Sequence, residues 1–515
     1  MTAEASAGLS ADITGLPAWT LDEGQLGDLE LLLSGALAPL RGFMSPAEVD
    51  SVTAEGRLPD GTAWPVPVTF EVPASAIKPD AARLLLQDPE GTPLAVLDIT
   101  DRLPALPDLV RMGGPVTAYR PAEHGPFRHL RRTPAEVREE FAGAPVLAYV
   151  TNAPLHCHQI GQLRHAASQL KARLLLLPML AGPAEVVIRP DALVRTVQAA
   201  ARSLPPGTQV IPVPLRPYHA APQDELALRA IVAAAYGATH LLADKPVAPA
   251  RPGEDESRPG PVIPVLSPGD WAYDPVAEVW RPLSLIEAGT ERTDLASGEL
   301  EDMLDRGVEV PAWFTPPAVA QELRRARPPR SERGLVIFLT GLSGSGKSTL
   351  ARALRDALSE RGERTVSLLD GDLVRSLLSA GLTFSRADRD LNIARIGFVA
   401  TEIARHGGIA ICAPIAPYAQ ARQEVRRAVQ EVGDFLLIHV ATPAEVCEAR
   451  DRKGLYAKAR AGLIDHFTGV SDPYEEPDDA DLVIDTSVVT RQQALDAVLH
   501  LLTDGGWLPA KTERR

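Results

Sequence analysis

Hydrophobic residues follow two different periods in the N-terminal half of the chain. Around residues 66–99 they form short alternating runs broken by glycine and proline, which is typical of half-buried strands in a β-rich domain. From about residue 133, apolar runs alternate with segments of helical period. The expected strands are 145–150, 173–178, 209–213 and 239–243, and the expected helices are 134–141, 191–201 and 222–236. This alternation predicts a parallel α/β sheet.

A second α/β alternation follows a charged, proline-broken stretch at residues 324–331, which is typical of a solvated linker. The strands expected after it are 335–340, 365–369, 408–414, 435–440 and 482–485. They predict a five-stranded parallel sheet wound with helices, whose functional groups lie at the carboxyl ends of the strands.

Composition narrows the classes of function. The chain has 515 residues and a formal net charge of −15, which argues against general binding to nucleic acid or to a membrane surface. Its three cysteines lie far apart and favour a reducing compartment over a disulfide framework. Residues 1–12 do not fit a signal peptide, and no apolar run is long enough to span a membrane. We therefore expect a cytoplasmic protein.

Residues 341–348 read GLSGSGKS and fit the phosphate-loop pattern G-x-x-x-x-G-K-[ST] at every fixed position. An apolar strand precedes the motif and a helical period follows it, as the pattern requires. Backbone amides of such a loop surround phosphates, Lys347 reaches the β- and γ-phosphates, and the Ser348 hydroxyl binds Mg²⁺. The alternative is a glycine-rich turn with a chance lysine. The expected ATP-binding residues are Gly341, Leu342, Ser343, Gly344, Ser345, Gly346, Lys347, Ser348 and Thr349.

Acidic residues close the next strand. Asp370 and Asp372 flank a glycine there and can orient a hydroxyl nucleophile or support Mg²⁺ through water; a simple turn is the alternative. Further on, Arg389 and Asn392 lie three residues apart, on one side of an expected helix. The alternative is that this side is simply a charged face in contact with solvent. Phe384 is an aromatic residue in a polar loop, either a core residue or a base-stacking one.

Several motifs of residues 334–515 together resemble adenylyl-sulfate (APS) kinase. They read LDGDLVR, FSRADRDLNIARIG, PY at 417–418, KGLYAKARAG at 453–462, FTG at 467–469 and DPYE at 472–475. The resemblance implies that ATP donates its γ-phosphoryl group to the ribose 3′-hydroxyl of APS, giving 3′-phosphoadenosine 5′-phosphosulfate (PAPS) and ADP. One usual feature differs, because Ala416 stands where some members have a serine before the PY pair. Direct in-line transfer is therefore expected.

The same resemblance assigns roles to single residues. Asp372 orients or deprotonates the 3′-hydroxyl, with Lys347 and Asp370 as the other catalytic residues and Ser348 as the Mg²⁺ ligand. Arg450 lies against the ATP adenine. The residues implied for APS are Asp372, Arg375, Phe384, Arg389, Asn392, Lys458 and Phe467, with the two phenylalanines on either side of adenine and Lys458 in a lid.

Most of residues 20–325 resemble ATP sulfurylase. The resemblance rests on LGDLELLLSGALAPLRGFM at 26–44, DGTAWP at 60–65, YGATH at 236–240 and the segment 298–323. The family motif Q-x-R-N-P-x-H-x-x-H is degenerate here. Pro154 and His156 match it, whereas Asn152 replaces the arginine, Ala153 the asparagine and Gln159 the second histidine. The later G-R-D-H-A-G motif becomes LADKPVA at 242–248. Losing such preorganised groups is expected to silence the reaction.

Together these patterns predict an α/β protein in five parts. They are a β-rich PUA-like domain at 1–132, a Rossmann-like nucleotidyltransferase domain with a degenerate site at 133–280, a small part at 281–325, a linker at 326–333 and an APS kinase domain with a P-loop at 334–515. We expect an APS kinase that uses ATP, APS and Mg²⁺ and forms a symmetric homo-oligomer. Three alternatives stay open: a bifunctional PAPS synthase, an N-terminal region that only regulates or assembles the enzyme, and another small-molecule P-loop kinase.

Overall fold

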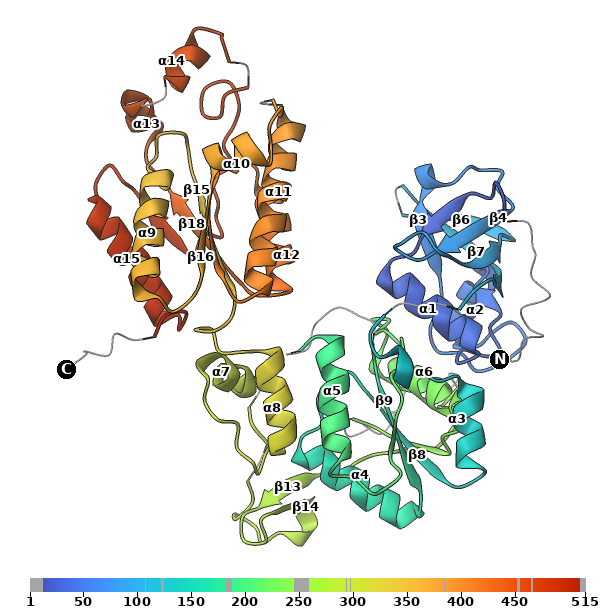
Figure 1. Cartoon of the computed structure of the whole chain (residues 1–515). Coiled ribbons are helices and arrows are strands. Elements are labelled where there is room, and N and C mark those ends of the chain that lie inside the picture. Colours follow the sequence, from blue (N-terminus) through green and yellow to red (C-terminus); the bar gives the residue numbers. More distant parts are fainter. Residues whose placement is uncertain are drawn as a thin grey trace. The chain divides into compact units, whose positions relative to one another are not determined.

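The structure is a computed structural model of the whole chain (Figure 1). It describes residues 13–106, 108–121, 125–180, 188–244, 259–292, 294–296, 298–383, 385–451, 454–464 and 466–509. The chain forms two compact units, Met1–Leu300 with Val310–Ala326, and Glu301–Glu309 with Arg327–Arg515. Within the described ranges, no helix has the length and apolar character needed to cross a membrane.

The first unit begins with a β-rich part. Its sheet contains β1 (Ala18–Thr20), β2 (Gly42–Phe43), β3 (Phe70–Pro73), β4 (Arg83–Gln87), β5 (Pro93–Asp98), β6 (Asp101–Leu106) and β7 (Leu109–Ala118). Helices α1 (Glu23–Ser34) and α2 (Pro46–Glu55) each begin with a capping box, from Asp22 and Ser45. The predicted β-rich character is confirmed. Strands β6 and β7 were not predicted from the sequence, because Pro104 and Gly113–Gly114 interrupt the alternation of apolar and polar residues.

The first unit continues with a five-stranded parallel sheet in the order β10-β9-β8-β11-β12. The strands are β8 (Val146–Thr151), β9 (Arg173–Pro178), β10 (Gln209–Val210), β11 (His240–Leu242) and β12 (Val265–Leu266). The helices are α3 (Pro134–Phe141), α4 (Cys157–Leu170), α5 (Pro190–Ala201) and α6 (Pro222–Ala235). This confirms the predicted α/β sheet. Helix α4, which begins inside the degenerate motif, was not predicted from the sequence.

The last elements of the first unit are the hairpin β13 (Trp271–Asp274) and β14 (Val279–Pro282) and the helix α8 (Pro317–Ala326). Helix α5 packs against α8, and Arg195 of α5 donates to Glu322 of α8 at 3.1 Å. Short 3₁₀ segments occur at Ala74–Ala76, Arg128–Leu130 and Leu283–Leu285.

The second unit is built on a parallel sheet in the order β16-β17-β15-β18-β19. Its strands are β15 (Leu335–Thr340), β16 (Val366–Asp370), β17 (Ile409–Ala413), β18 (Asp434–Val440) and β19 (Leu482–Ile484). The predicted five-stranded parallel sheet is confirmed, with strand ends shifted by at most one residue. Every residue of β15 is buried, as a central strand covered on both faces requires.

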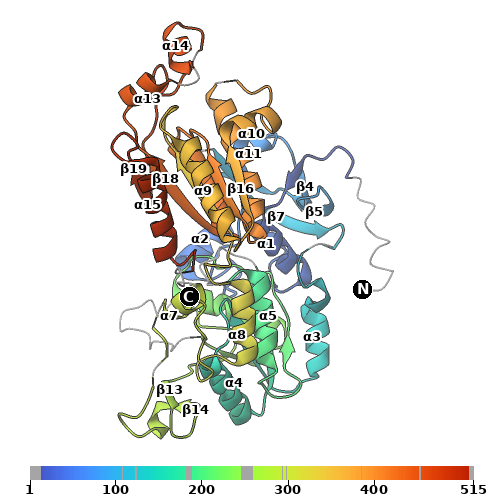
Figure 2. The ribbon, with the colours of Figure 1, turned by 60° about the vertical axis from the view of Figure 1, so that its left-hand side comes forward.

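Helices cover both faces of this sheet (Figures 1 and 2). Helices α9 (Lys347–Arg361) and α15 (Arg491–Asp504) bury Leu354 and Val498 on one face. Helices α11 (Arg386–Arg405) and α12 (Ala419–Gln430) bury Ile396 and Val425 on the other. The remaining helices are α10 (Gly371–Leu377), α13 (Ala444–Arg450) and α14 (Leu455–Arg460).

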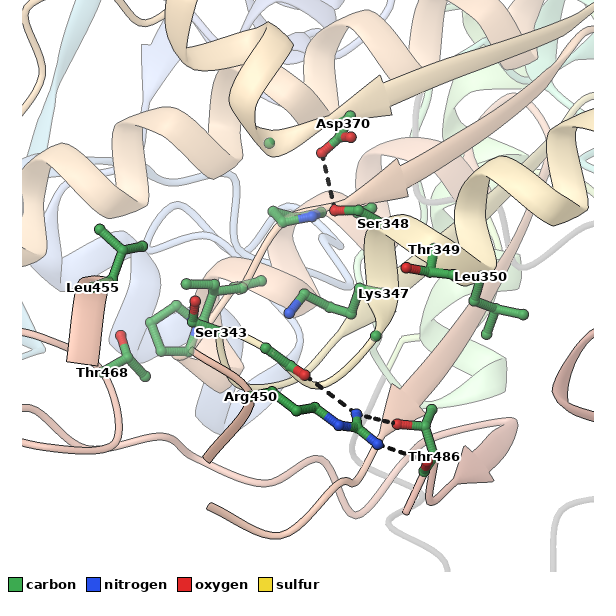
Figure 3. A pocket seen from close by; sticks show the side chains of 18 of the residues that line it. Ser343, Lys347, Ser348, Thr349, Leu350, Asp370, Arg450, Leu455, Thr468 and Thr486 are labelled. Atoms are coloured by element: carbon green, nitrogen blue, oxygen red, sulfur yellow. Dashed lines mark hydrogen bonds between the residues drawn. The ribbon is translucent and has the colours of Figure 1, made fainter. Parts of the chain in front are cut away.

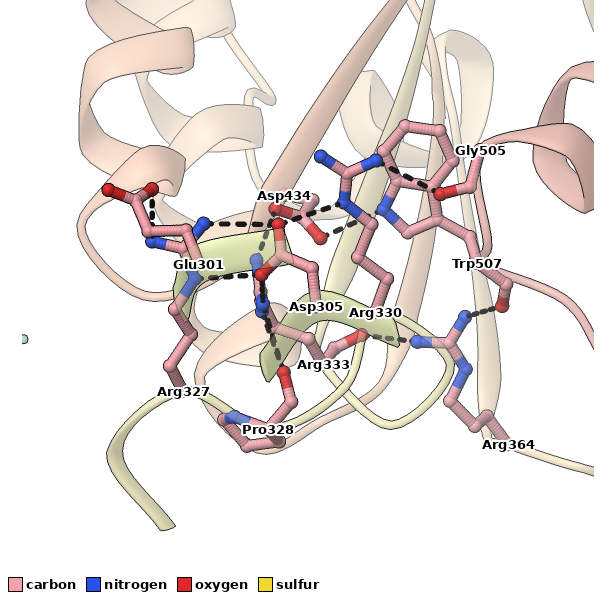
Figure 4. A network of polar contacts seen from close by, with 10 residues as sticks. All are labelled: Glu301, Asp305, Arg327, Pro328, Arg330, Arg333, Arg364, Asp434, Gly505 and Trp507. Carbon is pink, nitrogen blue, oxygen red and sulfur yellow. Dashed lines mark hydrogen bonds and ion pairs between the residues drawn. The ribbon is translucent and has the colours of Figure 1, made fainter. Parts of the chain in front are cut away.

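A polar network attaches residues Glu301–Glu309 to the second unit (Figure 4). Asp305, near the end of α7 (Glu299–Arg306), accepts from Arg327 Nε at 2.7 Å and pairs with Arg333. Arg333 also pairs with Asp434 at 3.1 Å, and Trp507 Nε1 donates to Asp434 at 2.8 Å. Burial alone would raise the pKa of Asp305, but the arginine hydrogen bonds outweigh it and lower that pKa to about 2.

Candidate active sites of the two α/β sheets

The phosphate loop joins β15 to α9 at the carboxyl end of the sheet. Gly341, Gly344 and Gly346 have φ of 146°, 80° and 104°, a region that favours glycine. A Cβ at Gly341 would lie 2.5 Å from the Val440 carbonyl oxygen, and one at Gly344 would lie 2.8 Å from that of Cys447. The glycines are therefore needed both for backbone conformation and for close packing.

Lys347 is the first residue of α9, and its side chain folds back over the loop. Its Nζ donates to the carbonyl oxygens of Gly341 at 2.8 Å and Leu342 at 2.7 Å. The lysine is buried, yet it lines a cavity of about 710 Å³. The loop thus holds a positive charge beside the amino end of a helix, and both features favour an anion in the cavity.

Side chains from neighbouring segments donate hydrogen bonds to carbonyl oxygens of the loop. Thr442 Oγ1 and Thr486 Oγ1 donate to the Ser345 carbonyl at 3.0 and 2.8 Å, and they lie 2.8 Å from each other. Arg450 donates to the carbonyls of Gly344 at 3.3 Å and Thr486 at 2.8 Å (Figure 3). These contacts fix the backbone of the loop, and Arg450 and Thr486 also line the cavity.

Asp370 ends β16 and faces the loop across the cavity. Its Oδ1 accepts from Ser348 Oγ at 3.2 Å (Figure 3), and its Oδ2 pairs with Arg352 at 2.8 Å. Hydroxyl and carboxylate oxygens together fit Mg²⁺, which binds through few protein oxygens, water and substrate phosphates. Asp372 and Arg375 lie on α10, directly after Asp370, and their side chains are outside the described part of the structure.

The opposite wall of the cavity comes from α11. Arg389 Nη1 donates to Thr468 Oγ1 at 2.6 Å and to Asp472 at 2.7 Å, and Tyr418 OH donates to the same carboxylate at 2.6 Å. Among the described residues, Asn392 Oδ1 is buried without a hydrogen-bond partner, whereas most buried polar atoms are paired. Both Arg389 and Asn392 line the cavity.

Only some of the remaining residues predicted for the site line the cavity. Phe467 is buried and lines the cavity, with its ring centroid 5.0 Å from that of Tyr456 in an edge-on arrangement. Arg450 also lines the cavity, whereas Lys458 on α14 is exposed and is not among the described lining residues. Phe384 lies outside the described residues.

The sequence analysis missed four residues that shape this site, namely Arg352, Thr442, Tyr456 and Thr486. Tyr456 OH donates to the Ser343 carbonyl at 3.0 Å. Tyr456 stood inside the KGLYAKARAG motif, which was its only signal. Threonines after apolar strands are common, so Thr442 and Thr486 gave none.

The corresponding loop of the first unit joins β8 to α4 and contains the degenerate motif. His156 Nδ1 lies 2.6 Å from Thr315 Oγ1, and its ring stacks on Phe314 with centroids 4.3 Å apart. Burial lowers the pKa of His156 to about 4. The imidazole is therefore uncharged at neutral pH and already bonded within the chain.

The other polar groups of this loop are also used internally. The backbone amide of His156 donates to Gln159 Oε1 at 3.0 Å, and the amide of Cys157 donates to the Phe314 carbonyl at 2.9 Å. Thr151 Oγ1 forms a small turn with Ala153. Gln159 thus binds the amino end of α4 from the position that the family gives to a histidine.

Two further residues of this loop were predicted as parts of the degenerate site. Asn152 is partly exposed and Pro154 is buried. His158, one position before Gln159, pairs through Nδ1 with Asp294 at 3.2 Å and stacks against Trp280. No arginine occupies the loop between β8 and α4, residues 152–156, all of which are described.

Three family models match the chain in order. A PUA-like domain matches residues 1–105, ATP-sulfurylase matches residues 128–251, and adenylylsulphate kinase matches residues 333–485. These matches confirm both resemblances proposed from the sequence and the predicted fold class.

Several relatives match the chain over nearly its whole length. The chain is 36% identical over 551 residues to a sulfate adenylyltransferase of Phaeosphaeria nodorum and 37% identical over 549 residues to one of Chaetomium globosum, covering 97% of this chain and 96% of each relative. It is also similar to a solved structure, a hexameric APS kinase from Thiobacillus denitrificans, with a TM-score of 0.77 and 35% identity over 96% of this chain and 94% of that one. The chain therefore belongs to the sulfate adenylyltransferase family and combines PUA-like, ATP-sulfurylase and adenylylsulphate kinase domains.

Proposed function

We propose that the protein phosphorylates APS at the ribose 3′-hydroxyl with ATP, and that its ATP-sulfurylase domain does not make APS. The observation that carries the proposal is the cavity of about 710 Å³. A phosphate loop and Lys347 form one wall, and Arg389 forms another with Asn392, whose Oδ1 has no hydrogen-bond partner. That volume lies in the upper half of the usual range for small-molecule sites.

Phosphoryl transfer in this cavity needs positioning and charge more than a strong base. The loop amides and Lys347 hold the β- and γ-phosphates of ATP, while Arg389 and Asn392 hold the phosphosulfate side of APS. Asp372 is the proposed acceptor of the 3′-hydroxyl proton. A bond forms between O3′ and the γ-phosphorus as the bond between that phosphorus and the β,γ-bridging oxygen breaks, and ADP leaves.

Mg²⁺, when bound with ATP, neutralises charge on the β- and γ-phosphates. Ser348 and Asp370 are the residues that would hold it. Ala416 offers no hydroxyl at the position where a covalent phosphoryl group could form, which supports direct transfer.

The proposed inactivity of the ATP-sulfurylase domain rests on charge. Adenylyl transfer develops negative charge that preorganised donors stabilise, and losing one such donor costs about 3 kcal/mol. Here an asparagine replaces the motif arginine, His156 is neutral at neutral pH, and Gln159 binds its own helix end. Several losses in one site leave little rate enhancement.

The second candidate is a bifunctional PAPS synthase. It is favoured by the fungal relatives, which are named for sulfate adenylyltransferase and align with 97% of the chain. The Thiobacillus denitrificans relative is named as an APS kinase. Because that relative is hexameric and similar over 96% of the chain, we also propose that this protein is a homo-oligomer.

A coupled ADP-release assay tests the proposed function. We expect ADP to form from ATP and Mg²⁺ only when APS is supplied, and not when sulfate and pyrophosphatase replace APS. Equal rates with sulfate and with APS would favour the bifunctional enzyme. The absence of APS-dependent ADP would defeat the proposal.

A further inference from the structure

Two side chains of the same helix hold the Asp370 carboxylate. Ser348 Oγ donates to its Oδ1 at 3.2 Å (Figure 3), and Arg352 Nη2 donates to its Oδ2 at 2.8 Å. Ser348 and Arg352 are four residues apart on α9, so they lie on one face of that helix. The carboxylate proposed above to hold Mg²⁺ is therefore already paired with a cation of the chain.

This ion pair differs from an ordinary surface pair. Arg352 lines the cavity, and the side chain of Asp370 is only 10% exposed. Arg355, three residues further along α9, pairs instead with its neighbour Asp356, and both of those side chains are exposed. Exposed pairs contribute little, whereas the charge of Arg352 lies where the nucleotide and the metal are proposed to bind.

The two partners of the pair are not equally fixed. The side chain of Arg352 is 57% exposed, in contrast to the nearly buried carboxylate of Asp370. An arginine that is largely in contact with water loses little when such a pair opens. The aspartate stays at the end of β16, and without a partner it would be an uncompensated charge. Asp370 can therefore exchange Arg352 for another cation, but it needs one.

The charges around Asp370 disfavour a free divalent cation. Asp370 and Arg352 together carry no net charge, and the ammonium group of Lys347 lines the same cavity. Repulsion between like charges is stronger in a partly buried site than in water. The phosphates of ATP supply the negative charge that the empty site lacks, and Mg²⁺ in such sites is bound through few carboxylates together with substrate phosphates.

We propose that Arg352 takes the place of the metal at Asp370 while the site is empty, so that the chain accepts Mg²⁺ only together with ATP. The inference rests on the proposed function and adds a positioning residue that acts through Asp370. When ATP and its metal bind, Asp370 exchanges Arg352 for the metal and the guanidinium returns to solvent. Without a metal, Arg352 limits the repulsion between Asp370 and the nucleotide phosphates.

Binding of Mn²⁺ to the nucleotide-free full chain tests the proposal, with the unbound ion followed by electron paramagnetic resonance. Arg352→Gln should bind Mn²⁺ at least about tenfold more tightly than the wild type, because it removes the competing charge. Arg352→Lys keeps a cation on the same helix face and should stay close to the wild type. The matched control is Arg355→Gln, which should not change Mn²⁺ binding. No gain in Arg352→Gln, or an equal gain in Arg352→Lys, would overturn the proposal.

A double variant locates the gained site. In Arg352→Gln/Asp370→Asn the gain in Mn²⁺ affinity should disappear, because the ion then lacks its carboxylate. An equal gain in the single and the double variant would place the additional Mn²⁺ away from Asp370 and would contradict the exchange.

Nucleotide binding without turnover gives a second measurement. Calorimetry measures the Kd of AMPPNP, a non-hydrolysable ATP analogue, with Mg²⁺ and with EDTA. The ratio of the EDTA value to the Mg²⁺ value should rise about tenfold in Arg352→Gln, because metal-free nucleotide then meets an uncompensated carboxylate. Both values come from one protein, so a partly unfolded sample does not mimic the result. An arginine that only holds a phosphate would weaken both bindings equally, and an unchanged ratio would contradict the exchange.

ADP formation from APS, measured on the same samples, separates this inference from the proposed function. If Arg352→Gln forms ADP but shows wild-type Mn²⁺ binding and a wild-type AMPPNP ratio, only the exchange at Asp370 is defeated. If both binding changes occur in a protein that forms no ADP from APS, the exchange stands and the kinase is defeated.

Discussion

The two α/β sheets of this protein have the same construction, but they differ in which polar groups of the loop remain available to a ligand. Each has a central strand, β15 or β8, whose carboxyl end leads through a short loop into a helix, α9 or α4. In the second unit, Thr442 and Thr486 bind a carbonyl oxygen of the loop, and Lys347 and loop glycines line a cavity. In the first unit, the loop groups bind one another and the segment around Phe314.

The amino end of the helix shows the difference most directly. The first residue of α9 is Lys347, which faces the cavity. The first residue of α4 is Cys157, whose amide is bonded to the Phe314 carbonyl. A strand–loop–helix scaffold therefore does not by itself make a phosphate site. The groups that remain available at its end decide the chemistry.

The largest effect is expected from Lys347→Ala, which removes the cation from the phosphate loop of the second unit. APS-dependent ADP formation should fall by about 10²–10³ in kcat, the usual cost of losing one preorganised charge contact. Steady-state kinetics with saturating Mg²⁺ measure the change. Lys78→Ala, an exposed lysine in the other unit, is the control. A Lys347→Ala enzyme with unchanged kcat would contradict the proposal that the Lys347 charge distinguishes the phosphate loop from the loop of the first unit.

A smaller but clear effect is expected on stability from Asp305→Asn. The pKa of Asp305 is lowered to about 2, so its ionisation stabilises the fold by about 2 kcal/mol above pH 5. This contribution is lost as the pH falls from the unfolded pKa of about 4 through 2. Urea unfolding of both proteins should show a gap at pH 7 that narrows below pH 4. Asp356→Asn is the control, because Asp356 is exposed and pairs with Arg355 at the surface. A stability difference between wild type and Asp305→Asn that does not depend on pH would contradict the proposed stabilisation of Asp305 by arginines.

Thr486→Val sharpens the comparison at the hydrogen bonds that hold the phosphate loop. It removes hydrogen bonds to the Ser345 carbonyl and to Arg450, each worth about 1 kcal/mol. The KM for ATP should rise about tenfold, and kcat should change less. Thr486→Ser keeps the hydroxyl and should restore the wild-type KM. If the serine and valine variants behave alike, the hydroxyl does not position the loop.

The smallest effect concerns His156, where no activity need change. Because burial lowers its pKa to about 4, the ring should stay neutral down to about pH 5. NMR titration of the imidazole in the full chain measures this directly. Titration of His156 near pH 6.5 would mean that it is solvated and available for a ligand.

Patterns in the sequence predicted most of the core and less of the site. Uninterrupted apolar runs located β15 and β9, and the change to a helical period near residue 133 located α3, because each is a local signal. The strands β6 and β7 were missed because glycine and proline interrupt them. The helix α4 was missed because its start coincides with a motif read for catalysis.

The site residues divide in the same way. The glycines and Lys347 follow from a contiguous motif. The pairing of Thr442 with Thr486, and of Asp305 with Arg333, joins residues that are far apart in the chain, and neither pairing leaves a pattern in the sequence. Such contacts depend on tertiary packing and required the structure.

The most direct test measures both half-reactions on one preparation of the full chain. One assay follows ADP formed from ATP, Mg²⁺ and APS; the other follows pyrophosphate released from ATP, Mg²⁺ and sulfate, against a Pro154→Ala/His156→Ala variant. We predict APS-dependent ADP formation, and pyrophosphate release no higher than in the double variant. Sulfate-dependent release well above that variant, or no ADP from APS, would contradict the account.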